Sequence, residues 1–179
     1  VELSKGVYTL VAVPYSAEGE AKADNALVYN FYFNGSGDMP EVEVNVEVNT
    51  PAYFAEEDKK AEVEAESPAC FNVACKVAAD ASQLKAVKFW YGNAQALVSQ
   101  NIDDDTLFAN YAGDASGIIE KIAENGAALM TFNVTAETPN FVVKLRFETI
   151  YGTYVDKTIE YELPKYDGTF PVGAYKFTE

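Results

Sequence analysis

Acidic side chains gather at three places in this sequence where they could bind a metal ion. These are Glu56 to Asp58, Asn101 to Asp105, and Asp114 with Glu120. Calcium takes six to eight oxygen ligands, so carboxylates on a loop are its usual ligands, but none of the three stretches has the spacing of an EF-hand loop. We expect no bound cofactor, with these carboxylates in solvent or, for Asp103 to Asp105, at a helix N-terminus. A calcium site with Asp103 and Asp105 as ligands is the alternative.

Histidine is absent from the chain, which removes the commonest general base and the commonest zinc ligand together. Two carboxylates can hydrolyse a glycoside without a histidine, but among 28 acidic residues some carboxylates will lie near one another by chance. No glycine-rich phosphate-binding loop is present either. We therefore expect a protein that is not an enzyme. A carboxylate-dependent glycosidase, as an accessory or catalytic domain, is the third interpretation of the function.

The elements that would position such side chains are strands. From Phe141 to Phe147, apolar residues fall on alternate positions, with Lys144 and Arg146 between them. This period of two, with charges on one side, is typical of a half-buried strand in an antiparallel sheet. Similar alternation predicts further strands at 42–48, 61–66, 71–77, 84–91, 127–135 and 153–163. The chain is therefore expected to be all-β.

Two segments of the chain resemble strand F and the F–G turn of a fibronectin type III domain. Each has an aromatic residue, alternating apolar positions and a glycine after the strand: Pro139, Phe141, Val143, Leu145, Phe147 and Gly152 in one, and Tyr8, Leu10, Ala12 and Gly19 in the other. The resemblance implies an antiparallel β-sandwich of the fibronectin type III-like or immunoglobulin-like kind. The tryptophan that such modules carry on strand B has no counterpart, since Phe71 is the nearest aromatic residue.

The acidic composition, rich in tyrosine and alanine, is similar to that of surface-protein modules of gut Bacteroidetes. This resemblance implies a secreted or surface-attached protein, and therefore an extracellular location. The leading interpretation of the function is a non-catalytic spacer or adhesion element in a multidomain surface protein. Its expected partners are neighbouring domains of the same polypeptide, with a glycan or another surface protein as the other candidates.

Trp90 is the residue that could bind a sugar. It lies two residues from Lys88 in the expected strand, so the two side chains share one face, and Trp90 is expected to point away from the core. In a fibronectin-like sheet its strand would lie beside the strand of Lys144 and Arg146, and the guanidinium and the indole could stack, worth about 0.5–1 kcal/mol. These four residues form a candidate ligand-binding site, and a carbohydrate-binding module is the alternative function. In the other interpretation, Trp90 is covered by a helix at 118–123 or by a neighbouring strand.

The net charge of −15, from 28 acidic and 13 basic residues, disfavours two classes of partner. Each phosphate contact needs a cation, so a chain this acidic is a poor binder of nucleic acid. Anionic membrane surfaces are disfavoured for the same reason. No apolar run approaches the roughly 20 residues that a membrane-spanning helix needs. We therefore expect no nucleic-acid partner and no membrane insertion.

The strand pattern divides the chain into three parts. Residues 1–35 are expected to be the C-terminal hairpin of a preceding β-sandwich module, with its turn at 16–19, and to make few contacts with the core of the next part. Residues 38–164 are expected to form a complete fibronectin-like sandwich. Residues 165–179 are expected to be a linker and the first strand of a following domain. A strand added to the complete module is the alternative for this last part.

The β pattern breaks at residues 100–126, which predicts a helical insertion in the complete module. Within it, the residues from Ser116 onward have the apolar spacing of a short helix. Asp114 or Ser116 is expected to be its N-cap, since short polar side chains accept hydrogen bonds from the first free N–H groups. Asn125 and Gly126 are expected to end it.

Cys70 and Cys75 are five residues apart. In one continuous strand they would lie on opposite faces, with about 17 Å between them. A disulfide requires Cα atoms within about 7 Å of each other. We therefore predict two free thiols, with Cys75 buried, and one continuous strand through both positions.

Overall fold

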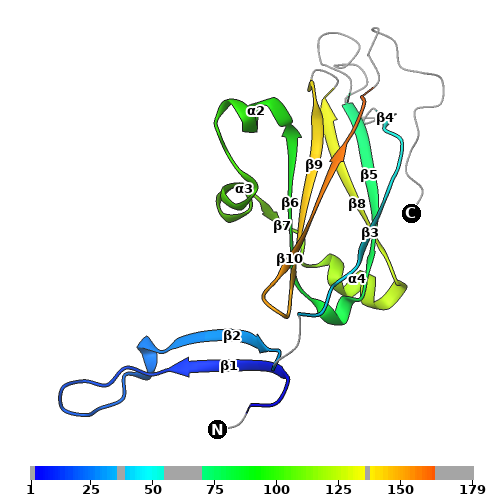
Figure 1. The fold of residues 1–179 in the computed structure, drawn as a ribbon. Helices are drawn as coiled ribbons and strands as arrows, with labels where there is room; N and C mark the ends of the chain where they lie inside the picture. The colour runs from blue at the N-terminus through cyan, green and yellow to red at the C-terminus, as the bar shows by residue number, and fades with distance from the viewer. Residues whose placement is uncertain (1–2, 36–38, 55–69, 136–137, 164–179) are drawn as a thin grey trace.

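The computed structural model describes residues 3–35, 39–54, 70–135 and 138–163. Their strands form three antiparallel sheets, two of which face each other as a β-sandwich while the third is a separate hairpin (Figure 1). The predicted all-β class is confirmed, although short helices accompany the strands. No helix in this part of the chain is long and apolar enough to cross a membrane. The strand expected at 61–66, the acidic residues 56–58 and the tail 165–179 lie outside the described residues.

The first sheet of the sandwich is built around β5 (Cys70–Ala79). β8 (Ala128–Thr135) pairs with residues 70–77 of β5. β3 (Val44–Val48) and β4 (Ala52–Phe54) pair with the two ends of the same strand. Because β8 occupies one edge of β5 over most of its length, β3 and β4 share the opposite edge.

The second sheet has the strand order β10-β9-β6-β7. β6 (Leu84–Asn93) and β9 (Phe141–Thr149) lie in its centre, and β10 (Tyr154–Glu160) forms one edge. β7 (Gly113–Asp114) forms the other edge, but it pairs with two residues of β6 alone. Most of that side of β6 is therefore without a neighbouring strand among the described residues.

The core lies between the two sheets and consists of the inward-facing residues of both. In β5, Phe71 and Val77 have no exposed surface, and in β9 the same holds for Leu145 and Phe147. Each such side chain contributes roughly 1.5–3 kcal/mol to stability by leaving water. The alternate positions that the sequence predicts to face the core do so, namely Phe71, Val73, Cys75 and Val77 in β5 and Phe141, Val143, Leu145 and Phe147 in β9.

The strand that contains both cysteines is continuous, as predicted, because β5 runs without interruption from Cys70 to Ala79. Cys75 is a buried free thiol, and burial raises its pKa to about 11. The hydroxyl of Tyr161, which follows β10, donates a 2.7 Å hydrogen bond to the carbonyl oxygen of Ala74 in β5. Burial raises the pKa of Tyr161 as well. This bond joins the end of the second sheet to the centre of the first.

The helical part of the chain begins earlier than the predicted residue 100. α2 (Ala94–Ser99) follows β6 directly, and the side chain of Asn93 caps it by accepting a hydrogen bond from the N–H of Gln95 at 2.9 Å. α3 (Asp104–Asn110) comes next. The capping asparagine is therefore a signal in the sequence from which α2 could have been predicted.

α4 (Ile118–Asn125) covers one end of the core, where its buried Ile122 packs. It ends as predicted at Gly126, whose φ of 77° is a left-handed conformation that glycine adopts without strain. The expected N-cap is wrong, because Gly117 occupies that position without a side-chain hydrogen bond. Asp114 and Ser116 form a turn of their own, in which the carboxylate accepts from the serine N–H at 2.7 Å.

β1 (Gly6–Ala12) and β2 (Leu27–Phe33) form a two-stranded sheet of their own. This hairpin projects from one end of the sandwich (Figure 1). Its predicted turn is present, with Gly19 at a φ of 83°. No residue of the hairpin belongs to the core cluster of the described residues, as expected, and Tyr29 is 66% exposed.

Candidate functional site

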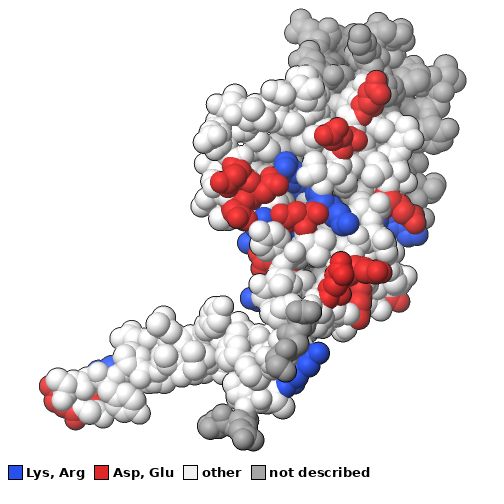
Figure 2. All heavy atoms as spheres, viewed as in Figure 1, with Lys and Arg blue, Asp and Glu red and all other residues white. Residues whose placement is uncertain are grey.

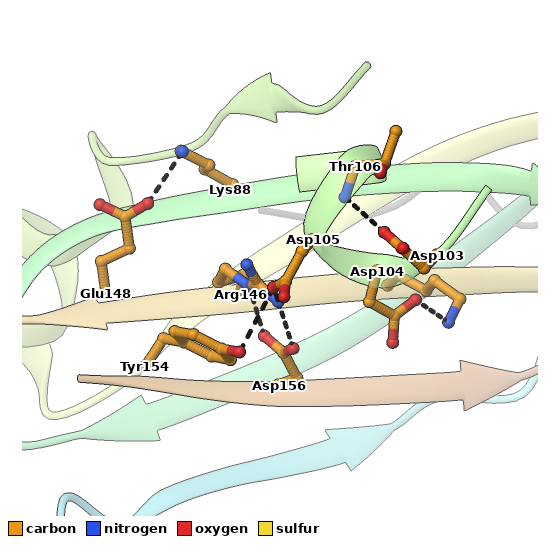
Figure 3. A network of polar contacts seen from close by, with 10 residues as sticks. Lys88, Asp103, Asp104, Asp105, Thr106, Arg146, Glu148, Tyr154 and Asp156 are labelled. Carbon is orange, nitrogen blue, oxygen red and sulfur yellow. Dashed lines mark hydrogen bonds and ion pairs between the residues drawn. The ribbon is translucent and has the colours of Figure 1, made fainter. Parts of the chain in front are cut away.

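The four residues of the predicted ligand-binding site lie together on the outer face of the second sheet. In the register of β6 and β9, Trp90 is opposite Lys144, and Lys88 is opposite Arg146. The two strands are therefore neighbours, as the resemblance implied. α3 lies against this face, and its Leu107 is fully buried there without belonging to the core between the sheets. Figure 3 shows the polar side chains that connect the helix to the strands.

Arg146 is the centre of the site, and only 7% of its surface is exposed. Its Nε and Nη2 donate to the two carboxylate oxygens of Asp156 at 2.8 and 2.7 Å, and Nη2 lies 2.8 Å from Oδ1 of Asp105 (Figure 3). The guanidinium carbon is 3.8 Å from the ring centroid of Tyr154 and 4.6 Å from that of Phe108. The hydrogen bonds to Asp156 raise the pKa of Arg146 against the opposing effect of burial. The guanidinium is thus permanently charged and held by β10 and α3.

The expected stacking of Arg146 on Trp90 is wrong, because the rings beside the guanidinium are those of Tyr154 and Phe108. Trp90 itself is half-buried. Its indole lies against Gly92, where an added Cβ atom would come within 3.0 Å of the ring. α4, one of the elements considered as a cover for the indole, packs against the core instead.

The two lysines of the site are paired with carboxylates. Nζ of Lys144 lies 2.7 Å from Asp104, and Nζ of Lys88 lies 2.8 Å from Glu148. Lys144 is the more buried of the two lysines, with 17% of its side chain exposed against 35% for Lys88, and its ion pair ties the first turn of α3 to β9. Every cation of the predicted ligand-binding site therefore has an anionic partner within the protein.

The acidic residues at 103–105 begin α3 and do not gather around one point. Asp103 is the N-cap, since its carboxylate accepts a 2.7 Å hydrogen bond from the N–H of Thr106. That bond lowers the pKa of Asp103, while Asp105 turns to Arg146. Within the described ranges, no group of three or more acidic or cysteine side chains could hold a metal ion. The expected helix N-terminus is confirmed, and Asp103 and Asp105 do not form the pair of ligands that the calcium alternative requires.

An aromatic groove that the sequence did not predict lies between β6 and β8. Phe89, Tyr91 and Phe132 line it, with ring centroids 5.1–6.3 Å apart. Thr131 and Asn133, which alternate with the buried Phe132 along β8, border the groove, and its volume is about 370 Å³. Strand parity places Tyr91 on the core side, but β7 covers too little of β6 to bury it, and Tyr91 is 42% exposed. The most exposed aromatic residue of β6 is therefore this tyrosine and not the tryptophan.

Comparisons with protein-family models, with curated proteins and with solved structures returned no match. The function is therefore inferred from the fold and the site of this chain alone. Together they define an antiparallel β-sandwich that carries a helix fastened to its outer face by ion pairs.

Proposed function

We propose that this chain is a non-catalytic β-sandwich module of the fibronectin type III-like kind, and that it acts as a spacer or adhesion element in a multidomain surface protein. The strand order supports this topology. Immunoglobulin-like sandwiches of about seven strands distribute consecutive strands between two antiparallel sheets. Here β5 and β8 lie in one sheet, and β6, β9 and β10 lie in the other.

The observation that carries the proposal is the pairing of all three cations of the candidate site with carboxylates. Lys88, Lys144 and Arg146 hold the strands and α3 together. A ligand that displaced Asp156 from Arg146 would leave this carboxylate without its cation, and breaking a buried pair costs about 3–5 kcal/mol. The same pairing engages Asp105 and Asp156, which removes them as free acids for glycoside hydrolysis. A rigid module with a fastened helix is suited to hold other domains apart.

The charge of the chain supports a role between other domains. A net charge of −15 makes most faces of two such modules repel one another. Neighbouring domains of the same polypeptide are therefore the proposed partners, in an extracellular or surface-attached protein. Nucleic acid is disfavoured, since the cations that could contact phosphates at the candidate site are already paired.

Glycan-array screening of the 179-residue chain, combined with thermal unfolding in the presence of any glycan retained, tests the spacer function. We expect no glycan to be retained and none to raise the melting temperature. A glycan that stabilises the chain by mass action would contradict the spacer function. The residue on which such binding depends would then identify the site.

A carbohydrate-binding module is the second candidate function, and the aromatic groove favours it. Tyr91 offers an exposed ring with its own hydroxyl, and Thr131 and Asn133 border the same groove; an aromatic ring near polar residues is what sugar-binding sites need. If a glycan binds, Tyr91→Ala should weaken its affinity at least about tenfold. Tyr111→Ala is the matched control, because Tyr111 is 59% exposed outside the groove. Retention of binding in Tyr91→Ala would exclude the groove.

A further inference from the structure

Apolar residues lie on both sides of the hairpin: the exposed Val7, Val11 and Val28 on one side, and three aromatic rings with two leucines on the other. We call this second side the aromatic face and define it as Tyr8, Leu10, Leu27, Tyr29 and Phe31, which share one side in the register of β1 and β2. Phe31 stacks on Tyr8 with ring centroids 5.9 Å apart and on Tyr29 at 6.4 Å. Leu10, Leu27 and Tyr29 are 56, 75 and 66% exposed. Each large side chain left in water forgoes roughly 1.5–3 kcal/mol, so burial of this face would be strongly favourable.

The opposite side of the hairpin contacts the sandwich at Tyr32, while Val7, Val11 and Val28 on the same side are 52, 52 and 63% exposed. The ring of Tyr32 packs edge-on against Tyr151 with centroids 4.5 Å apart. Neighbouring residues of a strand point to opposite faces, so this contact directs Phe31 and the rest of the aromatic face away from the sandwich. Figure 1 shows the hairpin standing clear of both sheets. The sandwich of the same chain therefore leaves the aromatic face uncovered.

The strands of the hairpin lack the features that keep exposed strand edges from pairing. Natural edge strands carry charges or prolines, and the edge strand β10 contains Asp156, Lys157 and Glu160. β1 and β2 contain no charged residue and no proline. An isolated two-stranded hairpin is at best marginally stable. The hairpin therefore carries no charge or proline on its strands that would oppose contact with another β structure.

We propose that the aromatic face is covered by the aromatic face of a second copy of this chain, so that two hairpins stack about a two-fold axis into a four-stranded β unit. The inference rests on the proposed function and names the partner of an adhesion module. Identical chains most often associate as two-fold dimers, in which the same surface of each copy forms the contact. Tyr8 and Phe31 are already partly buried and the other three side chains are 56–75% exposed, so the face offers on the order of 500 Å² per copy, and the roughly 1,000 Å² of the pair meets the lower bound for a specific interface.

The distribution of charge favours this contact over others between two copies. The net charge of −15 makes most faces repel, whereas the strands of the hairpin are uncharged, as the white surface between its tip and the sandwich shows (Figure 2). The tip carries Glu18, Glu20 and Asp24 against one lysine, Lys22, and the base carries Lys5. In an antiparallel stack, the acidic tip of each copy lies over Lys5 of the other. Opposite charges then meet at both ends of the interface.

Sedimentation velocity of the 179-residue chain over a range of micromolar concentrations tests the proposal. We expect a monomer–dimer equilibrium. Tyr29→Glu places a carboxylate in the aromatic face and should weaken dimerisation at least about tenfold, because a buried unpaired charge is costly. Val28→Glu is the matched control: the neighbouring residue is 63% exposed on the opposite side of the hairpin, and its substitution should change the dissociation constant by less than about twofold.

Selective weakening by Tyr29→Glu, with an unchanged melting temperature of the sandwich, supports the dimer. A wild-type chain that sediments as a monomer throughout overturns the dimer but leaves the spacer function intact, since glycan binding is measured separately. Equal weakening by Tyr29→Glu and Val28→Glu also overturns it, because folding of the hairpin and not its aromatic face would then control association. Weakening by Val28→Glu alone would show that the other face is the interface.

Discussion

Arg146 and Tyr154 lie face to face on neighbouring strands, with the guanidinium carbon 3.8 Å from the centroid of the ring. The hydroxyl of the same tyrosine donates a 3.3 Å hydrogen bond to Asp105 in α3. Tyr154 therefore contacts the cation with its ring and one of the anions with its hydroxyl. The docking of α3 on the sheet depends on this arrangement around a single buried charge.

Replacing Arg146 by leucine should lower the free energy of unfolding by about 3 kcal/mol, because Asp156 and Asp105 lose the cation that they share. This is the lower end for buried pairs, since the side chain of Asp105 is 74% exposed. Lys88→Met is the control, and its more exposed pair with Glu148 should contribute less than about 1 kcal/mol. Urea unfolding measures both. Equal losses in the two variants would contradict the central role of Arg146.

Gly113→Ala should destabilise the sandwich by about 1–3 kcal/mol. The added Cβ atom would lie 2.7 Å from the ring of Phe89, so this ring, which packs against Phe132, would have to shift to make room. Gly117→Ala is the matched control, because an added Cβ atom there meets nothing within 4 Å. Thermal unfolding should show a lower melting temperature for Gly113→Ala alone. An unchanged melting temperature would show that β6 and β7 adjust without cost.

Stability should fall in alkali because of Cys75. Its folded pKa of about 11 is above the ordinary value of roughly 8.5, so the buried neutral thiol stabilises the fold fully below pH 8.5 or so and loses this contribution as the pH rises toward 11. Between pH 7 and 10 the wild type should lose roughly 1–2 kcal/mol more than Cys75→Ala. Urea unfolding at the two pH values measures the difference. Parallel losses in both proteins would assign the effect to other groups.

Both cysteines should react with a thiol reagent in denaturant without reductant. The reason is the continuous strand β5, which keeps Cys70 and Cys75 five residues apart along an extended backbone. In the folded protein Cys75 should be unreactive, since it is buried and its thiolate is disfavoured. Recovery of no free thiol in denaturant would contradict the strand.

Deleting residues 1–35 should leave a sandwich that unfolds in one cooperative transition. The free energy of unfolding should fall by about 1.5 kcal/mol, which is the value of one aromatic pair, because among the described residues the ring of Tyr32 in the hairpin packs on Tyr151 of the sandwich. Tyr32→Ala in the full chain is the control and should reproduce this loss. Non-cooperative unfolding of the shortened chain would show that the hairpin is an integral part of the sandwich.

The sequence by itself determined the local elements of this protein. The alternation from Phe141 to Phe147 and from Phe71 to Val77 identified two strands and the faces that they bury, because a period of two is a property of each strand alone. Asp103 and Gly126 marked the ends of helices for a similar reason. A cap satisfies backbone groups of its own helix, and so it needs no distant partner.

Only the tertiary structure decided which of these elements meet and what their polar side chains do. Lys144 pairs with Asp104, 40 residues away, and Arg146 lies over Tyr154 and not over the expected indole. Tyr91 is exposed because β7 is short, and the aromatic face around Tyr29 is exposed because the hairpin stands apart from the sandwich. Ion pairs and burial depend on distances of a few ångströms between segments far apart in the chain, and the packing of sheets and helices sets those distances.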